Sequence, residues 1–349
     1  MNPFVLAILL FSLGLGTMLT LTSSHWLLAW MGLEINTLAI LPLMARHHHP
    51  RAVEAATKYF LTQATGAAVL LFATTTNAWL LGEWDIYQLS HPIATTMIML
   101  ALALKVGLAP LHFWLPEVLQ GLDLTTGLIL STWQKLGPFA LIIQVAPTVN
   151  PSLLVSMGVL STLIGGWGGL NQTLLRKILA YSSIAHLGWM VLILQFAPSL
   201  TLLSLTLYLV MTSAAFLSFK SYTATNINFM ALSWTKSPAL AALTALILLS
   251  LGGLPPLTGF MPKWLILQEL TKQGLPLTAT VAAMSALLSL YFYLRLCYAL
   301  SFMASPSTLN SSSTWRLSFT QPTLPLSTAT MGALALLPLT PAIAAFLTI

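Results

Sequence analysis

Gly107-Leu108-Ala109-Pro110-Leu111 is the stretch that decides how this chain folds, because it occurs twice. The first copy runs on to Pro116-Glu117. The second copy, Gly253-Leu254-Pro255-Pro256-Leu257, runs on to Pro262-Lys263 in the same register. Each proline removes a backbone N–H and clashes with the preceding helical turn. Each copy lies within hydrophobic sequence and has a lysine close by. The repeat therefore predicts two transmembrane helices broken in the same way, a pattern typical of ion pathways.

The composition indicates an all-α polytopic membrane protein. The chain has 349 residues, of which 57% are hydrophobic and only 6% are charged, and its mean hydropathy is +0.87. Soluble domains carry about 25% charged residues. The formal charge of +6 is scattered beside apolar segments, which excludes a nucleic-acid-binding surface. The single cysteine, Cys297, excludes a disulfide framework, an all-cysteine iron–sulfur site and a multi-cysteine zinc site.

Eleven apolar stretches are long enough to cross a bilayer, which takes about 20 residues each. The fourth and ninth are overlong, and they contain the two proline-rich breaks. We expect spans at residues 3–22, 25–45, 57–81, 93–120, 124–146, 152–171, 175–197, 199–221, 238–271, 276–303 and 324–347. The N-terminal residues Met1-Asn2-Pro3 lead directly into apolar sequence, so we expect the first span to be retained.

The distribution of basic residues predicts the orientation in the membrane. Lysine and arginine collect on the N-terminal side, at Arg46, Arg51, Lys58, Arg176, Lys177, Lys220, Lys236 and Arg316. The opposite side holds Lys272 beside Glu83, Asp85 and Glu269. The positive-inside rule therefore places the N-terminus inside and, after an odd number of spans, the C-terminus outside.

Spans four and nine then run in opposite directions, which is typical of a transporter with inverted repeats. We expect a single membrane domain over residues 1–349. It comprises a first repeat at 1–146, a second repeat at 150–303, a loop at 304–323 rich in Ser, Thr and Pro, and a final helix at 324–347.

Four charged residues fall near the middle of predicted spans: Glu34, Lys105, Lys135 and Lys263. A charge at this depth costs about 2.5–3.5 kcal/mol even on the lenient insertion scale, so such residues usually have a function. The alternative is that they pair with one another or with backbone carbonyls and only hold the helices in register. One carboxylate and three lysines at similar depth favour a proton path, since a buried lysine responds to the distance of a neighbouring carboxylate.

Two histidines are further candidates for a proton relay. His112 follows Pro110, and His186 lies within the seventh predicted span. A lone histidine inside a membrane is often only a hydrogen-bonding helix contact. Near broken helices, its ability to change protonation makes a relay role the preferred interpretation.

Several of these segments resemble the antiporter-like membrane-arm subunits of respiratory complex I, the NADH–ubiquinone oxidoreductase. The resemblance covers essentially the whole chain. It rests on His25-Trp26-Leu27-Leu28-Ala29-Trp30-Met31-Gly32-Leu33-Glu34-Ile35-Asn36, on Lys58-Tyr59-Phe60-Leu61-Thr62-Gln63, and on residues 107–121, 176–188 and 252–264.

The resemblance implies a core subunit of the proton-pumping enzyme in the mitochondrial inner membrane, with the N-terminus in the matrix and the C-terminus toward the intermembrane space. Glu34 matches the family's key glutamate, Lys105 and Lys263 match the lysines of its two broken helices, and Lys135 matches its central lysine. The resemblance also implies two inverted repeats of five helices each, spans one to five and six to ten, followed by the eleventh. It further implies neighbouring antiporter-like chains as partners. NADH, FMN, iron–sulfur clusters and ubiquinone would be bound by other subunits, and we expect no cofactor in this chain.

Three functions remain open at this point. The first is a proton-translocating module in which Glu34 and Lys105 are coupled, Lys135 carries the proton and Lys263 ends the path, with His112 or His186 bridging gaps. The others are an autonomous Na⁺/H⁺ antiporter and a structural scaffold of the complex. We also expect anionic lipids such as cardiolipin at the inner basic residues Arg46, Arg51, Arg176 and Lys177.

Overall fold

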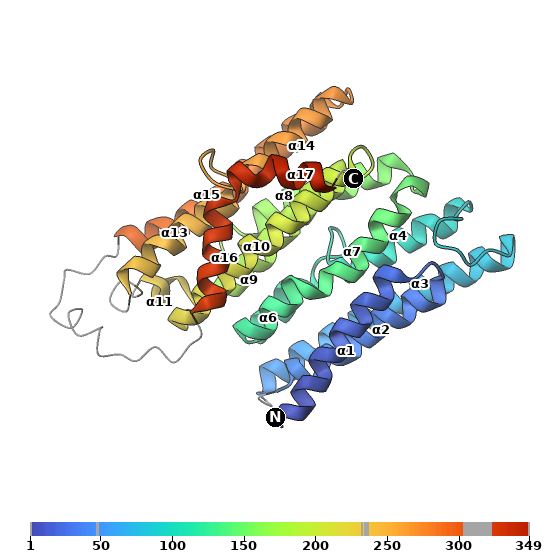
Figure 1. Ribbon diagram of the computed structural model, residues 1–349, viewed down its shortest axis with the longest axis horizontal. Helices are drawn as coiled ribbons and strands as arrows, with labels where there is room; N and C mark the ends of the chain where they lie inside the picture. The colour runs from blue at the N-terminus through green and yellow to red at the C-terminus, as the bar shows by residue number, and fades with distance from the viewer. Residues whose placement is uncertain (1, 47–48, 232, 234–236, 303–322, 348–349) are drawn as a thin grey trace. The chain divides into compact units, whose positions relative to one another are not determined.

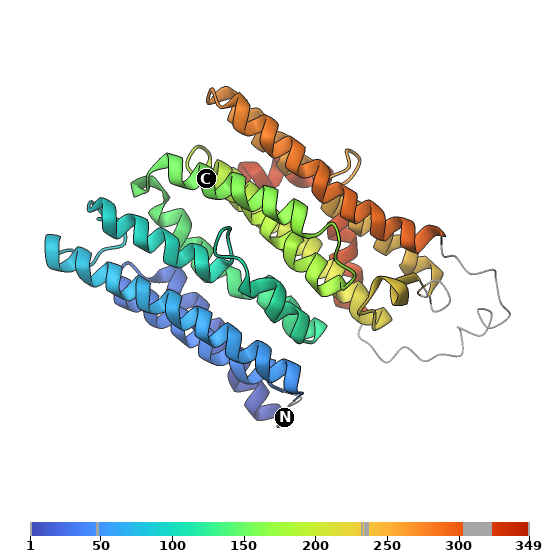
Figure 2. The same ribbon diagram turned by 180° about the vertical axis from the view of Figure 1, so that it is seen from behind.

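The computed structural model describes residues 2–46, 49–231, 233, 237–302 and 323–347 of the chain. Regular structure in these residues is helical, apart from two isolated β-bridges, His25–Asp85 and Leu174–Asn226. Figures 1 and 2 show the helices from opposite sides. A helix satisfies its backbone hydrogen bonds within one segment, which a hydrocarbon environment requires. The predicted all-α fold class is confirmed.

Seven helices in the described residues are long and apolar enough to cross a membrane. They are Pro3–Thr22, Trp26–Met44, Pro50–Leu81, Leu124–Thr148, Pro151–Gly168, Pro198–Tyr222 and Pro276–Ser301. The bent pair Leu324–Ala335 and Leu337–Phe346 makes an eighth candidate, and Pro92–Val106 and Pro238–Gly252 are shorter apolar helices. The polytopic membrane fold is confirmed, whereas the count of eleven spans stays a prediction.

The chain divides into two compact units, Met1–Gly158 and Val159–Ile349. The boundary falls inside helix α8 (Pro151–Gly168). The predicted repeats divide the chain slightly earlier, between 146 and 150, and their inverted relationship stays a prediction.

The first unit consists mainly of long helices that begin with proline or a side-chain cap. Its elements are α1 (Pro3–Thr22), α2 (Trp26–Met44), α3 (Pro50–Leu81), α4 (Pro92–Val106), α5 (Trp114–Gly121), α6 (Leu124–Ser131), α7 (Trp133–Val145) and the 3₁₀ turn η1 (Ala146–Thr148). The His49 ring caps α3 by accepting the Arg51 N–H at 3.3 Å. This cap lets α3 begin seven residues before the predicted span at 57–81, since its first turns are charged and fall outside an apolar window.

Helices α1 and α2 pack very closely (Figure 1). A methyl group added to Gly16 would lie 2.8 Å from the Gly32 carbonyl oxygen and 2.5 Å from Asn36 Oδ1. A methyl group on Gly32 would lie 2.9 Å from the Gly16 carbonyl oxygen. These paired glycines bring the two backbones together, which is how small residues stabilise helix pairs in membranes.

The first predicted break is confirmed. Helix α4 ends at Val106, Gly107 takes a left-handed conformation with φ of 87°, and the chain becomes helical again at Trp114. The peptide bond between Ala109 and Pro110 is cis. Glycine adopts this positive φ without the steric penalty of a side chain, so the Gly-Pro pattern ends α4 at a defined residue.

The fifth predicted span, 124–146, corresponds to one membrane-length helical segment, Leu124–Thr148, which has an irregularity at Thr132. Helices α6 and α7 meet at Thr132, whose φ and ψ are −111° and −71°. The Thr132 hydroxyl donates to the Leu128 carbonyl at 2.7 Å. Pro138 lies within α7 and has no N–H, so it cannot bond the Gln134 carbonyl one turn earlier. The interruption and the proline bracket Lys135.

The second unit repeats the pattern of a broken helix. It contains α9 (Leu175–Ile193), α10 (Pro198–Tyr222), α11 (Ile227–Ala231), α13 (Pro238–Gly252), α14 (Phe260–Lys272), α15 (Pro276–Phe302), α16 (Leu324–Ala335), η3 (Leu337–Leu339) and α17 (Thr340–Leu347). Helix α13 ends before Gly253, whose φ is 85°, and α14 begins at Phe260. The second predicted break is thereby confirmed.

The final predicted helix, 324–347, is bent rather than straight. Helix α16 and the following segment meet at an angle of 68°, and Pro338 at this point removes a helical N–H. The Thr258 hydroxyl in the second break donates to the Ala333 carbonyl near the end of α16, at 2.6 Å. Residues 304–322 of the predicted loop, with Lys236 and Arg316, lie outside the described residues.

Candidate functional site

The first unit contains a small buried cavity lined by two of the four predicted charged residues. Lys105 reaches it from α4 and Lys135 from α7, and their side chains are only 5% and 3% exposed. The space open to the centre of a water molecule is about 10 Å³, close to the minimum that holds one water. Polar side chains form part of the remaining lining, from Asn36, Thr37, Tyr59, Gln63 and Gln134, and the rest comes from Leu33, Val106, Trp114, Leu130 and Pro138.

Lys105 lies in the last turn of α4, directly before the first break. The Gln63 amide donates to the Lys105 backbone carbonyl at 3.5 Å. The Lys105 Nζ atom is buried and has no hydrogen-bond partner among the described residues. A buried ammonium group normally needs a partner, so water is the partner that this geometry calls for.

Glu34 lies beside this cavity without lining it. It is half-buried on α2, and its carboxylate accepts a hydrogen bond from Thr37 Oγ1 at 2.9 Å. Thr37 lines the cavity. Glu34 is near enough to Lys105 for their charges to interact, but the two side chains form no ion pair at contact distance within the described residues. The coupling of these two residues stays a prediction, and with this geometry it would act through space or through water.

Lys135 is held by an irregular stretch of helix. Its N–H donates to the Thr132 carbonyl at 3.3 Å, a one-turn bond at the start of α7. The neighbouring Gln134 amide donates to the Asn36 carbonyl on α2 at 3.3 Å. Lys135 thus lies between two residues, Thr132 and Pro138, at which regular helical hydrogen bonding is interrupted.

In the second unit, Lys263 interacts with the helix that precedes its break. Its ammonium group donates to the carbonyl of Gly252, the last residue of α13, at 2.7 Å. This contact places the lysine charge at the negative C-terminal end of α13. Lys263 and His186 line the same small cavities, together with Trp189.

The two histidines occupy different surroundings. His186 of α9 lies near Lys263, with its ring centroid 5.7 Å from that of Tyr208. His112 is 3% exposed in the first break, and its Nδ1 lies 3.2 Å from the Pro110 carbonyl oxygen. His112 does not line the cavity that holds Lys105 and Lys135. The relay role of either histidine stays a prediction.

Sequence reasoning missed most of the polar residues around these lysines. Tyr59 and Gln63 lie on α3, one turn apart, and both line the first cavity. Ser289 and Tyr293, which lie one turn apart on α15, line a cavity beside Lys263. The available signal was a polar side chain within a long apolar helix, because a glutamine within a membrane span usually faces a neighbouring helix or water.

Comparison with known sequences and structures identifies related proteins. The sequence model of the family described as NADH:quinone oxidoreductase/Mrp antiporter, TM, matches residues 23–289. That of NADH dehydrogenase subunit 2 C-terminus matches residues 290–344. The chain is 78% identical over 347 residues to NADH-ubiquinone oxidoreductase chain 2 of Oncorhynchus mykiss, covering 99% of both chains. It is 76% identical to the protein of the same name from Salmo salar, over 100% of both.

A solved structure shows the same fold. A chain of respiratory complex I from Thermus thermophilus superposes with a TM-score of 0.86 at 28% identity, covering 100% of this chain and 80% of the other. The chain therefore belongs to the NADH-ubiquinone oxidoreductase chain 2 family, within the wider group of antiporter-type membrane subunits of NADH:quinone oxidoreductases.

Proposed function

We propose that this chain moves protons through a relay of Glu34, Lys105, Lys135 and Lys263. Family membership makes it an integral inner-membrane subunit of the proton-pumping NADH:ubiquinone oxidoreductase. Glu34 and Lys105 form the coupled pair, Lys135 is the central proton carrier, and Lys263 is the terminal residue toward a neighbouring subunit.

The observation that carries the proposal is the cavity that Lys105 and Lys135 share. Lysines on different helices exchange protons only if water or another polar group connects them. The cavity has room for about one water molecule, and its polar lining supplies the partners that an ordered water needs.

The driving step is a change in the distance between Glu34 and Lys105. The carboxylate favours the charged lysine, and this attraction is strong at short range in a medium of low dielectric constant. Moving the two groups apart removes the attraction, so the Lys105 proton passes to water and then toward Lys135. Restoring the distance lets Lys105 take up another proton.

In the second unit, His186 stands beside Lys263, and an imidazole can both accept and donate a proton. The Gly252 carbonyl holds the Lys263 ammonium at the end of α13. We assign His186 as the relay group that delivers the proton to Lys263. His112 contacts the Pro110 carbonyl within its own segment. We assign it only as an alternative relay group at the first break.

The proposal also includes the orientation of the chain in the membrane, its lipid contacts and its partner subunits. The N-terminus lies in the matrix and the C-terminus faces the intermembrane space, as the basic residues of the inner side require. Arg46, Arg51, Arg176 and Lys177 bind anionic headgroups such as cardiolipin there. NADH, FMN, iron–sulfur clusters and ubiquinone are bound by partner subunits, which include neighbouring antiporter-like chains.

Two other functions have an observation in their favour. The matching family also includes Mrp antiporters, which favours autonomous Na⁺/H⁺ exchange. Purified chain in liposomes would then change internal pH in response to sodium without any partner. The Lys263–Gly252 hydrogen bond favours a structural scaffold. In that case, neutralising the buried charges would impair assembly and leave turnover per assembled complex unchanged.

Replacing Glu34 with glutamine tests the relay. The substitution removes the charge and keeps an acceptor for Thr37. We expect the assembled complex, reconstituted in liposomes, to pump fewer protons per NADH oxidised. Glu54→Gln, which removes an exposed carboxylate on α3, is the matched control and should pump normally. Normal pumping by Glu34→Gln in a fully assembled complex would falsify the coupled-pair role.

A further inference from the structure

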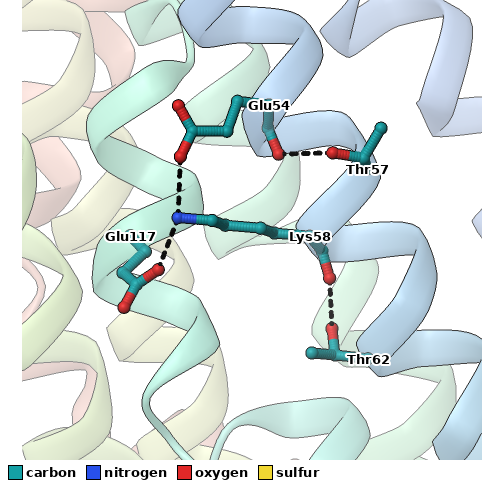
Figure 3. A network of polar contacts seen from close by, with 5 residues as sticks. All are labelled: Glu54, Thr57, Lys58, Thr62 and Glu117. Atoms are coloured by element: carbon teal, nitrogen blue, oxygen red, sulfur yellow. Dashed lines mark hydrogen bonds and ion pairs between the residues drawn. The ribbon is translucent and has the colours of Figure 1, made fainter.

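Three charged side chains meet where α5 contacts α3 (Figure 3). The Lys58 ammonium lies 2.8 Å from Glu54 Oε1 and 2.8 Å from Glu117 Oε2. Glu54 and Lys58 are both on α3, one turn apart, whereas Glu117 belongs to α5. The Lys58–Glu117 pair is therefore the contact in this network that joins the half-helix after the first break to its neighbour.

Helix α5 lies along α3 at two further points. Gly121, the last residue of α5, approaches so closely that an added methyl group would lie 2.6 Å from the Arg51 carbonyl oxygen. Trp114, the first residue of α5, packs edge-on against Tyr59 with ring centroids 5.7 Å apart. The ion pair lies between these two contacts, so the whole length of α5 rests on α3.

The ion pair is one helical turn from the proton cavity. Tyr59, which follows Lys58, and Trp114, which precedes Glu117 by one turn, both line the cavity of Lys105 and Lys135. The Trp114 indole N–H also donates to the Leu104 carbonyl, next to Lys105, at 2.9 Å. The position of α5 on α3 therefore sets one wall of this cavity.

The second break uses the matching position in a different way. Glu117 and Lys263 are each the fourth residue of the half-helix after a break, and each follows a proline. Lys263 bonds across its own break, to Gly252. Glu117 instead bonds a neighbouring helix. The same position thus fixes the half-helix after the break in both units. The residue there is acidic in the first unit and basic in the second.

We propose that Lys58 and Glu117 are a positioning pair that holds α5 on α3 and thereby keeps the Trp114 wall of the proton cavity in place. This inference rests on the proposed relay through Lys105 and Lys135. When the pair is broken, α5 loosens, Trp114 moves away and additional water enters the cavity. Protons then leak back past Lys105, and fewer are pumped for each NADH oxidised.

Because the pair is exposed, its loss should not prevent the complex from assembling. The side chains of Lys58 and Glu117 are 44% and 55% exposed, and an exposed ion pair adds little to overall stability. Variants of the pair are therefore expected to assemble. An exposed pair is also screened by salt, so its effect on pumping should weaken at high ionic strength in the unaltered chain.

The test compares Glu117→Gln with Glu54→Gln in the intact complex reconstituted in liposomes. Both remove a carboxylate from Lys58, but only Glu117→Gln removes the ion pair between α5 and α3. We expect the Glu117→Gln complex to oxidise NADH normally but to pump fewer protons per NADH oxidised. The Glu54→Gln complex should pump as many protons per NADH as the unaltered complex. Lys58→Met should show the same loss as Glu117→Gln, and Lys58→Arg should keep pumping, since arginine preserves the charge.

Equal pumping by Glu117→Gln and Glu54→Gln would overturn the inference, as would normal pumping by Lys58→Met. Lys135→Met, measured alongside, separates this failure from failure of the relay itself. If Lys135→Met abolishes pumping while the two glutamine variants are equal, only the positioning role is wrong. If Lys135→Met pumps normally, the relay proposal is wrong.

Discussion

Lys105 of α4 and Lys135 of α7 line one buried cavity, although regular helix ends just after the first and begins just before the second. Gly107 ends α4 two residues beyond Lys105, and Thr132 interrupts the other helix three residues before Lys135. Interrupted helices expose backbone polar groups that a continuous helix would satisfy. Both lysines thus lie beside an interruption of their helix.

The close packing of α1 and α2 predicts a strong effect of a small substitution. Gly16→Ala should force the helices apart and lower stability by about 1–3 kcal/mol, as overpacking typically does, because its methyl group would meet the Gly32 carbonyl. Gly14→Ala is the control, since no atom lies within 4 Å of its added methyl group. Thermal inactivation of the assembled complex measures both, and equal midpoints would contradict this packing.

The second break should depend on the Thr258 hydroxyl. Thr258→Val keeps the shape of the side chain but leaves the Ala333 carbonyl without its donor, at a cost of about 1–3 kcal/mol. Thr258→Ser retains the hydroxyl and should be close to normal. We expect limited proteolysis to cleave near α16 sooner in the valine variant. Identical cleavage of the two variants would show that this bond does not anchor the last helix.

Lys263 should be required for pumping, whereas a nearby surface lysine should not. Lys263→Met removes the ammonium held by Gly252, and we expect an assembled complex that pumps fewer protons per NADH. Lys272→Met is the matched control, because Lys272 lies on the same helix in an exposed pair with Glu269. A loss of assembly without any change in pumping per assembled complex would instead support the scaffold function.

The breaks themselves could be predicted from sequence because glycine and proline act locally. Gly107 and Gly253 end their helices through their own backbone conformation, whatever surrounds them. The interruption at Thr132 could not be predicted, since threonine is common within membrane helices. The bend near Pro338 was also missed, because neighbouring helices often let a proline remain in a straight span.

The site was predictable only in part, for a similar reason. The burial of Lys105 and Lys135 follows from their places in apolar segments. Their meeting in one cavity depends on how α4 and α7 pack, which involves contacts between distant parts of the chain. The pairing of Lys58 with Glu117 likewise requires α5 to lie on α3, and no local pattern in the sequence specifies that contact.

The most direct test of the relay is the number of protons pumped per NADH oxidised by the assembled complex carrying Lys135→Met. Methionine has a similar length and cannot carry a proton. Gln144→Leu is the matched control, because Gln144 lies on the same helix and does not line the cavity. The relay predicts that Lys135→Met pumps fewer protons per NADH while Gln144→Leu pumps normally. An unchanged ratio for Lys135→Met in a fully assembled complex would contradict it.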